Sequence, residues 1–118
     1  MATKDGGVYL PRKTKKYVAL ITQATTAAPA EGTVIENSVG DMTIARTSAG
    51  LYTWTCTGAF TANKTVVRIT PMGGAGAAGR SVAWVATSAD VCTLHFDDLA
   101  TPSAADSGNF QLEIEVYY

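Results

Sequence analysis

Apolar and polar residues alternate along much of the chain with a period of two, the pattern of β-strands that bury one face. The alternation is clearest in residues 110–118. One face of this segment would carry only apolar side chains: Phe110, Leu112, Ile114 and Val116. The positions between them are Gln or Glu, which suit a solvent-facing side. The segment is therefore predicted to be a central strand whose end also contributes to a subunit interface.

Residues 51–58, LYTWTCTG, alternate as strictly. Tyr52, Trp54 and Cys56 would share one face, while the opposite face would carry only leucine and threonine. On such strands the aromatic residues Tyr52, Trp54 and Trp84 are expected in the core. The alternative is that they line a platform that binds a sugar.

Eight runs of this kind are separated by turn-forming residues. They comprise residues 15–23, 33–37, 42–47, 51–58, 65–70, 81–87, 91–96 and 110–118. No window of eleven or more residues shows helical periodicity. The pattern predicts a single all-β domain, an antiparallel β-sandwich or jelly roll of about eight strands, because two sheets must cover each other's apolar faces.

Residues 1–16 differ from the rest of the chain in charge. They hold five of the nine basic residues and one acidic residue, a charge of about +4 against about −5 for the remainder. We therefore predict a basic N-terminal arm, residues 1–16, and a β-sandwich domain, residues 17–118. The arm is interpreted as a solvated terminus, as a segment that docks on an acidic neighbouring subunit, or as a contact to nucleic acid. Nucleic acid is the least favoured partner, because no aromatic stacking platform is interleaved with the charges.

The residues expected to form the docking interface come from both ends of the chain. The basic arm supplies charge, and the two terminal tyrosines cannot both point into the core. The predicted set is Arg12, Lys13, Lys15, Lys16, Tyr117 and Tyr118.

Composition favours association between copies. Charged residues make up 16% of the chain, against about 25% in an average domain, so repulsion between copies is weak. The N-terminus does not resemble a signal peptide, and no apolar stretch is long enough to span a bilayer. The protein is expected to be made in the cytoplasm and to contact no membrane. Cys56 and Cys92 are expected to be free thiols.

One motif of the chain is typical of enzymes. Residues 74–79 spell G-x-G-x-x-G, which cradles a pyrophosphate when a helix follows it. The residues that follow, SVAWVATSA, favour a strand instead. We therefore expect a loop between strands, and a dinucleotide-binding oxidoreductase fragment is the disfavoured alternative.

Other reactive side chains form no recognisable site. His95 and Cys92 are three positions apart, which on a strand places them on opposite faces. The loop acids lack the spacing of a calcium loop and are expected to be solvated: Asp41, Asp90, Asp97, Asp98 and Asp106. We expect no catalytic residue, no metal and no cofactor.

The stretch from Lys16 to Tyr118 resembles a family of small β-rich proteins encoded beside the structural genes of tailed phages. The likeness is carried by KKYVALITQ, by ARTSAGLYTWTCTGAFTANKT with its Arg-x-Ser-Ala-Gly-x-Tyr turn, and by the closing strand FQLEIEVYY. The chain departs from that family in its basic arm and in ending Tyr-Tyr rather than Tyr-Pro.

The resemblance implies a non-enzymatic virion protein of the head-fibre, capsid-decoration or tail-associated type, commonly a homotrimer. Its partners would be copies of itself and other virion proteins such as the capsid protein. An alternative is a host-adhesion module that binds a surface glycan through exposed aromatic residues.

Overall fold

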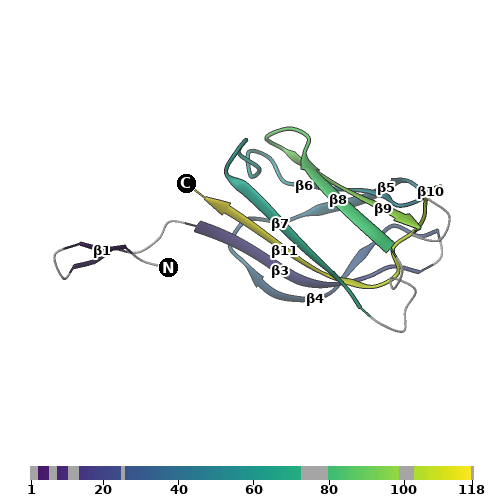
Figure 1. Cartoon of the computed structure of the whole chain (residues 1–118), viewed down its shortest axis with the longest axis horizontal. Helices are drawn as coiled ribbons and strands as arrows, with labels where there is room; N and C mark the ends of the chain where they lie inside the picture. The colour runs from purple at the N-terminus through teal and green to yellow at the C-terminus, as the bar shows by residue number, and fades with distance from the viewer. Residues whose placement is uncertain are drawn as a thin grey trace.

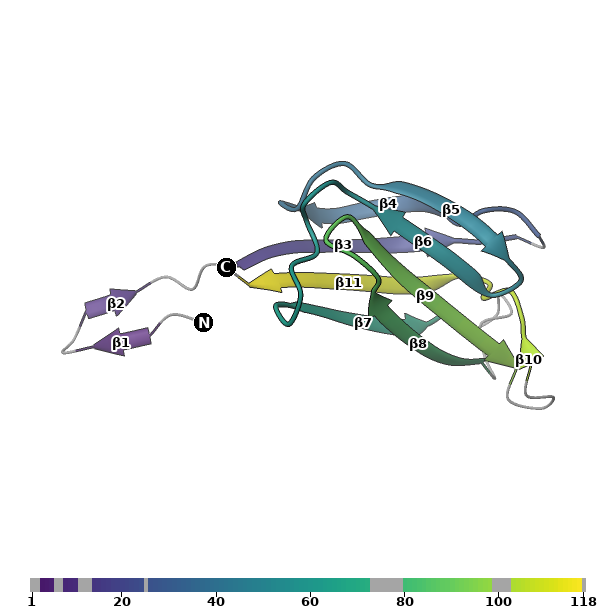
Figure 2. The same ribbon diagram turned by 90° about the horizontal axis from the view of Figure 1, so that it is seen from above.

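The protein folds as a β-sandwich of two antiparallel sheets (Figure 1), as the alternation predicts. The computed structural model describes residues 3–5, 8–10, 14–24, 26–72, 80–98 and 103–117. One sheet has the strand order β4-β3-β11-β7, and the other has the order β5-β6-β9-β8. Figure 2 shows the two sheets stacked one over the other.

The eight main strands each overlap one of the predicted runs. They are β3 (Thr14–Thr22), β4 (Ala30–Asn37), β5 (Thr43–Ser48), β6 (Leu51–Thr55), β7 (Thr65–Pro71), β8 (Arg80–Ala86), β9 (Val91–Asp98) and β11 (Phe110–Tyr117). A short strand, β10 (Ser103–Ala104), pairs with the last two residues of β9. Strand β8 pairs with β9 along the opposite edge, so β10 and β6 lie along the same edge of β9.

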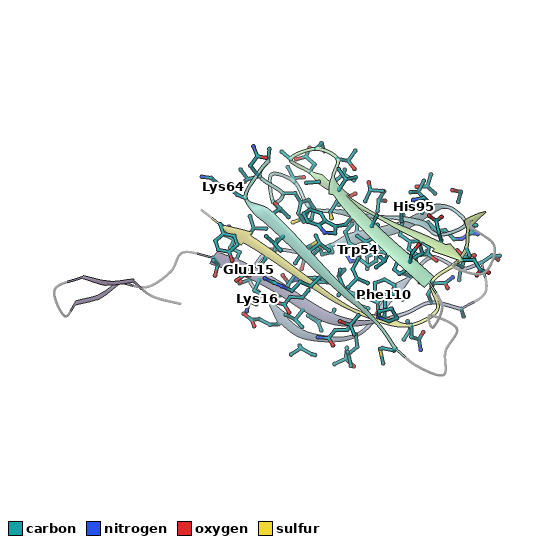
Figure 3. All side chains as sticks on the ribbon, in the orientation of Figure 1. Lys16, Trp54, Lys64, His95, Phe110 and Glu115 are labelled. Atoms are coloured by element: carbon teal, nitrogen blue, oxygen red, sulfur yellow. The ribbon has the colours of Figure 1, made fainter. Side chains whose placement is uncertain are left out.

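The core lies between the four inner strands, β3 and β11 of one sheet and β6 and β9 of the other. Tyr52, Trp54, Phe96 and Phe110 are completely buried, and their rings meet in the pairs Tyr52–Phe96, Phe96–Phe110 and Trp54–Phe110. The ring centroids of Phe96 and Phe110 are 5.0 Å apart, and the Trp54 ring meets Phe110 edge-on at 6.1 Å. The predicted core positions Tyr52 and Trp54 are thus confirmed, and Figure 3 shows Trp54 between the sheets.

Strand β11 is the central strand of its sheet. It pairs with β3 from Phe110 to Tyr117 and with β7 from Phe110 to Val116, without a break in either register. The four predicted inward residues are all buried: Phe110, Leu112, Ile114 and Val116. The period-two pattern of the sequence therefore identifies both the strand and its buried face.

Both cysteines are free thiols, as expected. Cys92 is completely buried on the inner face of β9, and burial raises the pKa of its thiol to about 12. A thiol that stays protonated at neutral pH is a poor nucleophile and a poor metal ligand. Cys92 is therefore a packing residue.

The predicted arm contains a small hairpin and the start of the sheet. Strands β1 (Thr3–Asp5) and β2 (Val8–Leu10) pair with each other and lie apart from the sandwich in Figures 1 and 2. Strand β3 begins at Thr14, so residues 14–16 of the predicted arm are paired with β11.

Candidate interaction surfaces

The described part of the predicted docking set lies at one end of the sandwich, where β3 begins and β11 ends. The strand register places Lys15 beside Val116, Lys16 beside Glu115 and Tyr117 beside Thr14. Figure 3 shows Lys16, Lys64 and Glu115 at this end. Basic and tyrosine residues that are about a hundred positions apart in sequence thus become neighbours. Arg12, Lys13 and Tyr118 lie outside the described residues.

The outer face of the β4-β3-β11-β7 sheet carries a row of paired charges. Arg68 Nη1 lies 3.1 Å from Glu113 Oε2 and 3.3 Å from Glu115 Oε1, and Lys16 Nζ lies 4.0 Å from Glu113. Burial alone would raise the pKa of Glu115, but hydrogen bonds from Tyr117 and Arg68 outweigh it and lower the pKa. Lys16 and Tyr117 are therefore already held on this face by glutamates of β11.

On the outer face of the other sheet, the described residues carry one acidic side chain, Asp97 at the end of β9, and apart from His95 the rest are Thr, Ser, Ala, Val and Leu. Cross-strand pairs such as Ala45–Thr53, Thr53–Thr93 and Thr93–Val85 form continuous rows. We call this surface the uncharged face. It consists of Thr43, Ala45, Ser48, Leu51, Thr53, Thr55, Ser81, Ala83, Val85, Val91, Thr93 and His95.

The uncharged face is broad enough for a contact with another molecule. Strands about 4.8 Å apart, each contributing about five residues, give a surface roughly 15–20 Å on a side. A shallow hollow of about 300 Å³ lies on it, lined by Leu51, Ala83, Trp84, Val85, Thr93 and His95. His95 stands at one end of the face, where its Nε2 is 3.3 Å from Asp97 Oδ1.

Trp84 is the exception among the aromatic residues predicted for the core. It belongs to the inward-facing row of β8, since it pairs with the buried Leu94, yet 39% of its surface is exposed. Strand β8 is an edge strand, and the hollow beside Trp84 opens at that edge of the sandwich. The prediction of a core position is therefore wrong for Trp84, because none of the described strands lies beyond the β8 edge to cover it.

The opposite edge of the sandwich, β4, is a poor template for adding another strand. All eight of its residues are exposed, including Val34 and Ile35 at 43% and 60%. Its pairing with β3 shifts register twice, between Val18 and Ala19 and between Leu20 and Ile21. Such bulges interrupt the row of backbone groups that a further strand would need.

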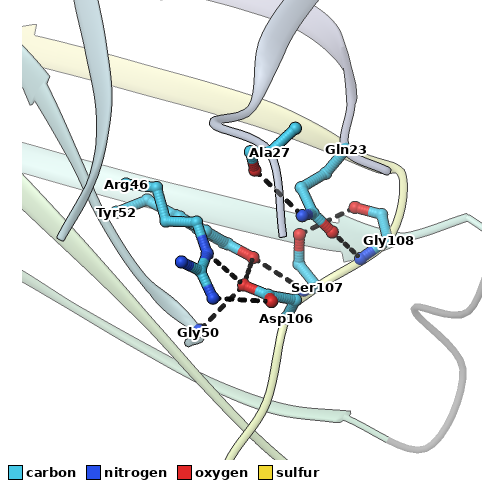
Figure 4. A network of polar contacts seen from close by, with 8 residues as sticks. All are labelled: Gln23, Ala27, Arg46, Gly50, Tyr52, Asp106, Ser107 and Gly108. Atoms are coloured by element: carbon cyan, nitrogen blue, oxygen red, sulfur yellow. Dashed lines mark hydrogen bonds and ion pairs between the residues drawn. The ribbon is translucent and has the colours of Figure 1, made fainter. Parts of the chain in front are cut away.

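A polar network fastens the linker that leads from β9 to β11 (Figure 4). Asp106 accepts hydrogen bonds from Arg46 Nε at 2.9 Å and Nη2 at 3.0 Å, and from the Tyr52 hydroxyl at 2.9 Å. It also accepts the backbone N–H of Gly50 at 3.1 Å. The hydrogen bonds from Arg46 lower the pKa of Asp106, and those from Gly50 and Tyr52 add to the effect against the opposing influence of burial. We call this arrangement the Asp106 clamp.

The linker is also tied to the end of β3. The N–H of Ser107 donates to the Tyr52 hydroxyl at 2.8 Å, and the N–H of Gly108 donates to Gln23 Oε1 at 2.9 Å. Burial raises the pKa of Tyr52, so its hydroxyl remains protonated and can donate to Asp106. These contacts hold the linker where it crosses from one sheet to the other.

The close packing around the Asp106 clamp explains why residue 50 is a glycine. A side chain at this position would bring its Cβ within 2.3 Å of the Phe96 carbonyl oxygen and 2.5 Å of the Ala105 carbonyl oxygen. Its φ of 69° is a left-handed conformation that glycine adopts without strain. The sequence marks the turn, but the contact that forbids a side chain there is a tertiary one.

The G-x-G-x-x-G motif is not followed by the helix that nucleotide binding requires. Residues 74–79 lie outside the described residues, but β7 and β8, which flank them, are strands of opposite sheets. A dinucleotide site needs a helix where β8 is found. The fold thus does not form the βαβ unit of an oxidoreductase at this position.

The remaining chemical candidates stay apart. His95 faces outward and Cys92 inward, as predicted from their spacing. Within the described residues, no three His, Cys, Asp or Glu side chains come together in a way that could hold a metal ion. Asp90 accepts the N–H of Gly58 at 2.7 Å. The expectation of a solvated side chain is wrong for Asp106, which is engaged with Arg46 and mostly buried. No helix in the described part of the chain is long and apolar enough to cross a membrane.

Sequence reasoning missed the Asp106 clamp and recognised only one strand of the uncharged face. The signal for the face is present in the sequence, because most outward positions of the four strands are Thr, Ser, Ala, Val or Leu rather than Lys and Glu. Comparison with models of known protein families, with curated protein sequences and with solved structures found no significant match.

Proposed function

We propose that this chain is a non-enzymatic structural protein of a phage particle, which assembles with copies of itself through the uncharged face. The single observation that carries this proposal is the contrast between the two outer surfaces. One sheet presents paired Lys, Arg and Glu side chains, and the other presents Thr, Ser, Ala, Val and Leu, with His95 and Asp97 at one end.

The uncharged face suits contact with a second copy for physical reasons. Burying an ionised side chain without a partner costs several kcal/mol, so surfaces that meet are depleted of charge at their centres. Threonine and alanine on flat strands bring two sheets close together, and threonine hydroxyls can donate to and accept from one another across the contact. A homotrimer is the favoured assembly, in line with the resemblance of the sequence to phage virion proteins.

The basic arm supports a second contact, to another virion protein such as the capsid protein. A two-stranded hairpin is at best marginally stable in water, so β1 and β2 would be stabilised by a neighbouring surface. The excess of Lys and Arg in residues 1–16 favours an acidic neighbour. Lys15, Lys16 and Tyr117 lie where the arm leaves the sandwich and are the residues proposed to border that contact.

A charge placed at the centre of the uncharged face tests the proposal. Thr53 lies between Ala45 and Thr93, so Thr53→Arg should reduce the mass measured by light scattering from that of an oligomer to that of the 12.3 kDa chain. The matched control is Gln111→Arg on the outer face of the other sheet, which should leave the oligomer intact. Equal masses for the two variants would exclude the uncharged face as the interface.

A further inference from the structure

We propose that the hollow beside Trp84 binds a neutral sugar ring of a glycan. Of the three aromatic residues considered for sugar binding, Tyr52 and Trp54 are completely buried and cannot contact a ligand. Trp84 is 39% exposed and lines a hollow of about 480 Å³. The structure thus narrows the aromatic candidates to one residue and gives it a site.

The lining of the hollow has the chemistry of a sugar site. Ala62 and Ala86 are small and leave the space beside the indole ring open. Asn63 and Thr65 supply polar groups on the side of β7. A pyranose ring has one apolar face of C–H groups and a rim of hydroxyls, so it can stack on an indole while its rim makes hydrogen bonds.

The polar groups are placed so that they can serve a ligand. Asn63 adopts a left-handed conformation with φ of 63°, in the turn closed by the hydrogen bond from Lys64 N–H to the Thr61 carbonyl at 3.1 Å. Its amide can both donate and accept. The Thr65 hydroxyl donates to the Thr61 carbonyl at 3.0 Å, which leaves its oxygen lone pairs for a sugar hydroxyl.

None of the described residues that line the hollow is charged, which determines the class of ligand. Its lining residues are Ala62, Asn63, Thr65, Trp84, Val85 and Ala86. Phosphates and acidic sugars need basic or N–H-rich sites, so a neutral hexose or N-acetylhexosamine unit fits better. The side chain of Trp84 belongs to the inward row of β8, but Trp84 and Val85 also line the hollow on the uncharged face, so the two hollows adjoin at the β8 edge.

The indole N–H signals of the two tryptophans provide the test. In ¹H–¹⁵N NMR spectra, titration with glucose, galactose, mannose and N-acetylglucosamine, each at millimolar concentration, should shift the Trp84 signal for at least one sugar. Trp54 is completely buried and serves as the internal control, whose signal should not move. Sialic acid is the acidic comparison sugar and should cause no shift.

Variants separate stacking from hydrogen bonding. Trp84→Ala tests stacking and should weaken binding about tenfold or more, because it removes the stacking surface. Asn63→Gly tests hydrogen bonding and should also weaken binding, because it removes the amide while it keeps the left-handed backbone. Ile35→Ala, at the exposed opposite edge, should bind like the wild type. The proposal is overturned if no neutral sugar shifts the Trp84 signal, if only sialic acid does, or if Trp84→Ala binds unchanged. A Trp84 signal that responds to protein concentration alone would assign the hollow to a contact between copies and would also overturn it.

Discussion

At the scale of single residues, the Asp106 clamp is the most specific polar feature of the protein. Asp106 and Arg46 are 60 positions apart, and their side chains are 18% and 22% exposed. Four donated hydrogen bonds surround one carboxylate: two from Arg46 and one each from Gly50 and Tyr52. Charge-assisted bonds of this kind are roughly twice as strong as neutral ones. The linker before β11 is therefore held mainly by the ionised form of Asp106.

The variant Asp106→Asn tests this dependence on charge. The pKa of Asp106 is lower in the folded protein than in the unfolded chain, so its ionised form stabilises the fold above the unfolded pKa of about 3.9. That contribution is lost as the pH falls towards and through the folded pKa. At pH 7 the variant should melt several degrees below the wild type. The difference between the two melting temperatures should shrink as the pH falls below about 4.

The control for this pH series is Asp41→Asn. Asp41 is exposed and makes no ion pair or hydrogen bond with the other described residues, so its variant should follow the wild type at every pH. A gap between Asp106→Asn and the wild type that stays constant from neutral to acidic pH would show that the clamp depends on shape and not on charge.

At the scale of elements, β11 is predicted to contribute most to stability. Ile114 is completely buried and lies between Tyr17 of β3 and Val67 of β7. Ile114→Ala should lower the free energy of unfolding by about 2–5 kcal/mol, measured by urea denaturation. Gln111→Ala, on the outer side of the same strand, should change it by no more than about 0.5 kcal/mol. Similar values for the two variants would contradict the assignment of the inner and outer faces of β11.

The arm is predicted to be dispensable for folding. Strand β3 begins at Thr14, and the first core residue of the sandwich is Tyr17. Deletion of residues 1–13 should leave the melting temperature and the oligomer mass unchanged, while docking to another virion protein should be lost. Deletion of residues 1–15 also removes the pairs of Thr14 and Lys15 with β11 and should lower the melting temperature. A chain that fails to fold after the shorter deletion would show that the arm belongs to the domain.

The positions of the eight strands could be predicted because their signals are local. Alternation fixes the buried face of a strand, and Gly, Asn, Asp and Ser mark its ends. In β11 and β6 these signals also identified the core residues Ile114 and Trp54. The packing of two sheets follows, since each strand has one apolar face to cover.

The rest could not be predicted because it depends on which strands become neighbours. The pairing of Arg46 with Asp106 requires that the linker cross beside the turn at Gly50, which no local pattern encodes. Trp84 has the alternation of a core residue, but its exposure results from the position of β8 at an edge. The strand order likewise decides that the outward residues of four strands form one uncharged face.

At the scale of the whole molecule, the sandwich has two unlike outer faces and two unlike ends. The charged face is formed by the sheet that contains β11, and the uncharged face by the sheet that contains β9 (Figure 2). The arm and the end of β11 lie at one end, and the Asp106 clamp secures the β9–β11 crossing at the turn between β5 and β6. Association through the uncharged face leaves the end with the arm free for a different partner.

The mass of the wild-type protein in solution, measured by sedimentation equilibrium at low and at high salt, tests this account most directly. A contact formed by uncharged side chains is not weakened by salt, whereas a contact between opposite charges is screened. We predict about three times the chain mass of 12.3 kDa at both salt concentrations. A single-chain mass, or an oligomer that dissociates as salt is raised, would contradict assembly through the uncharged face.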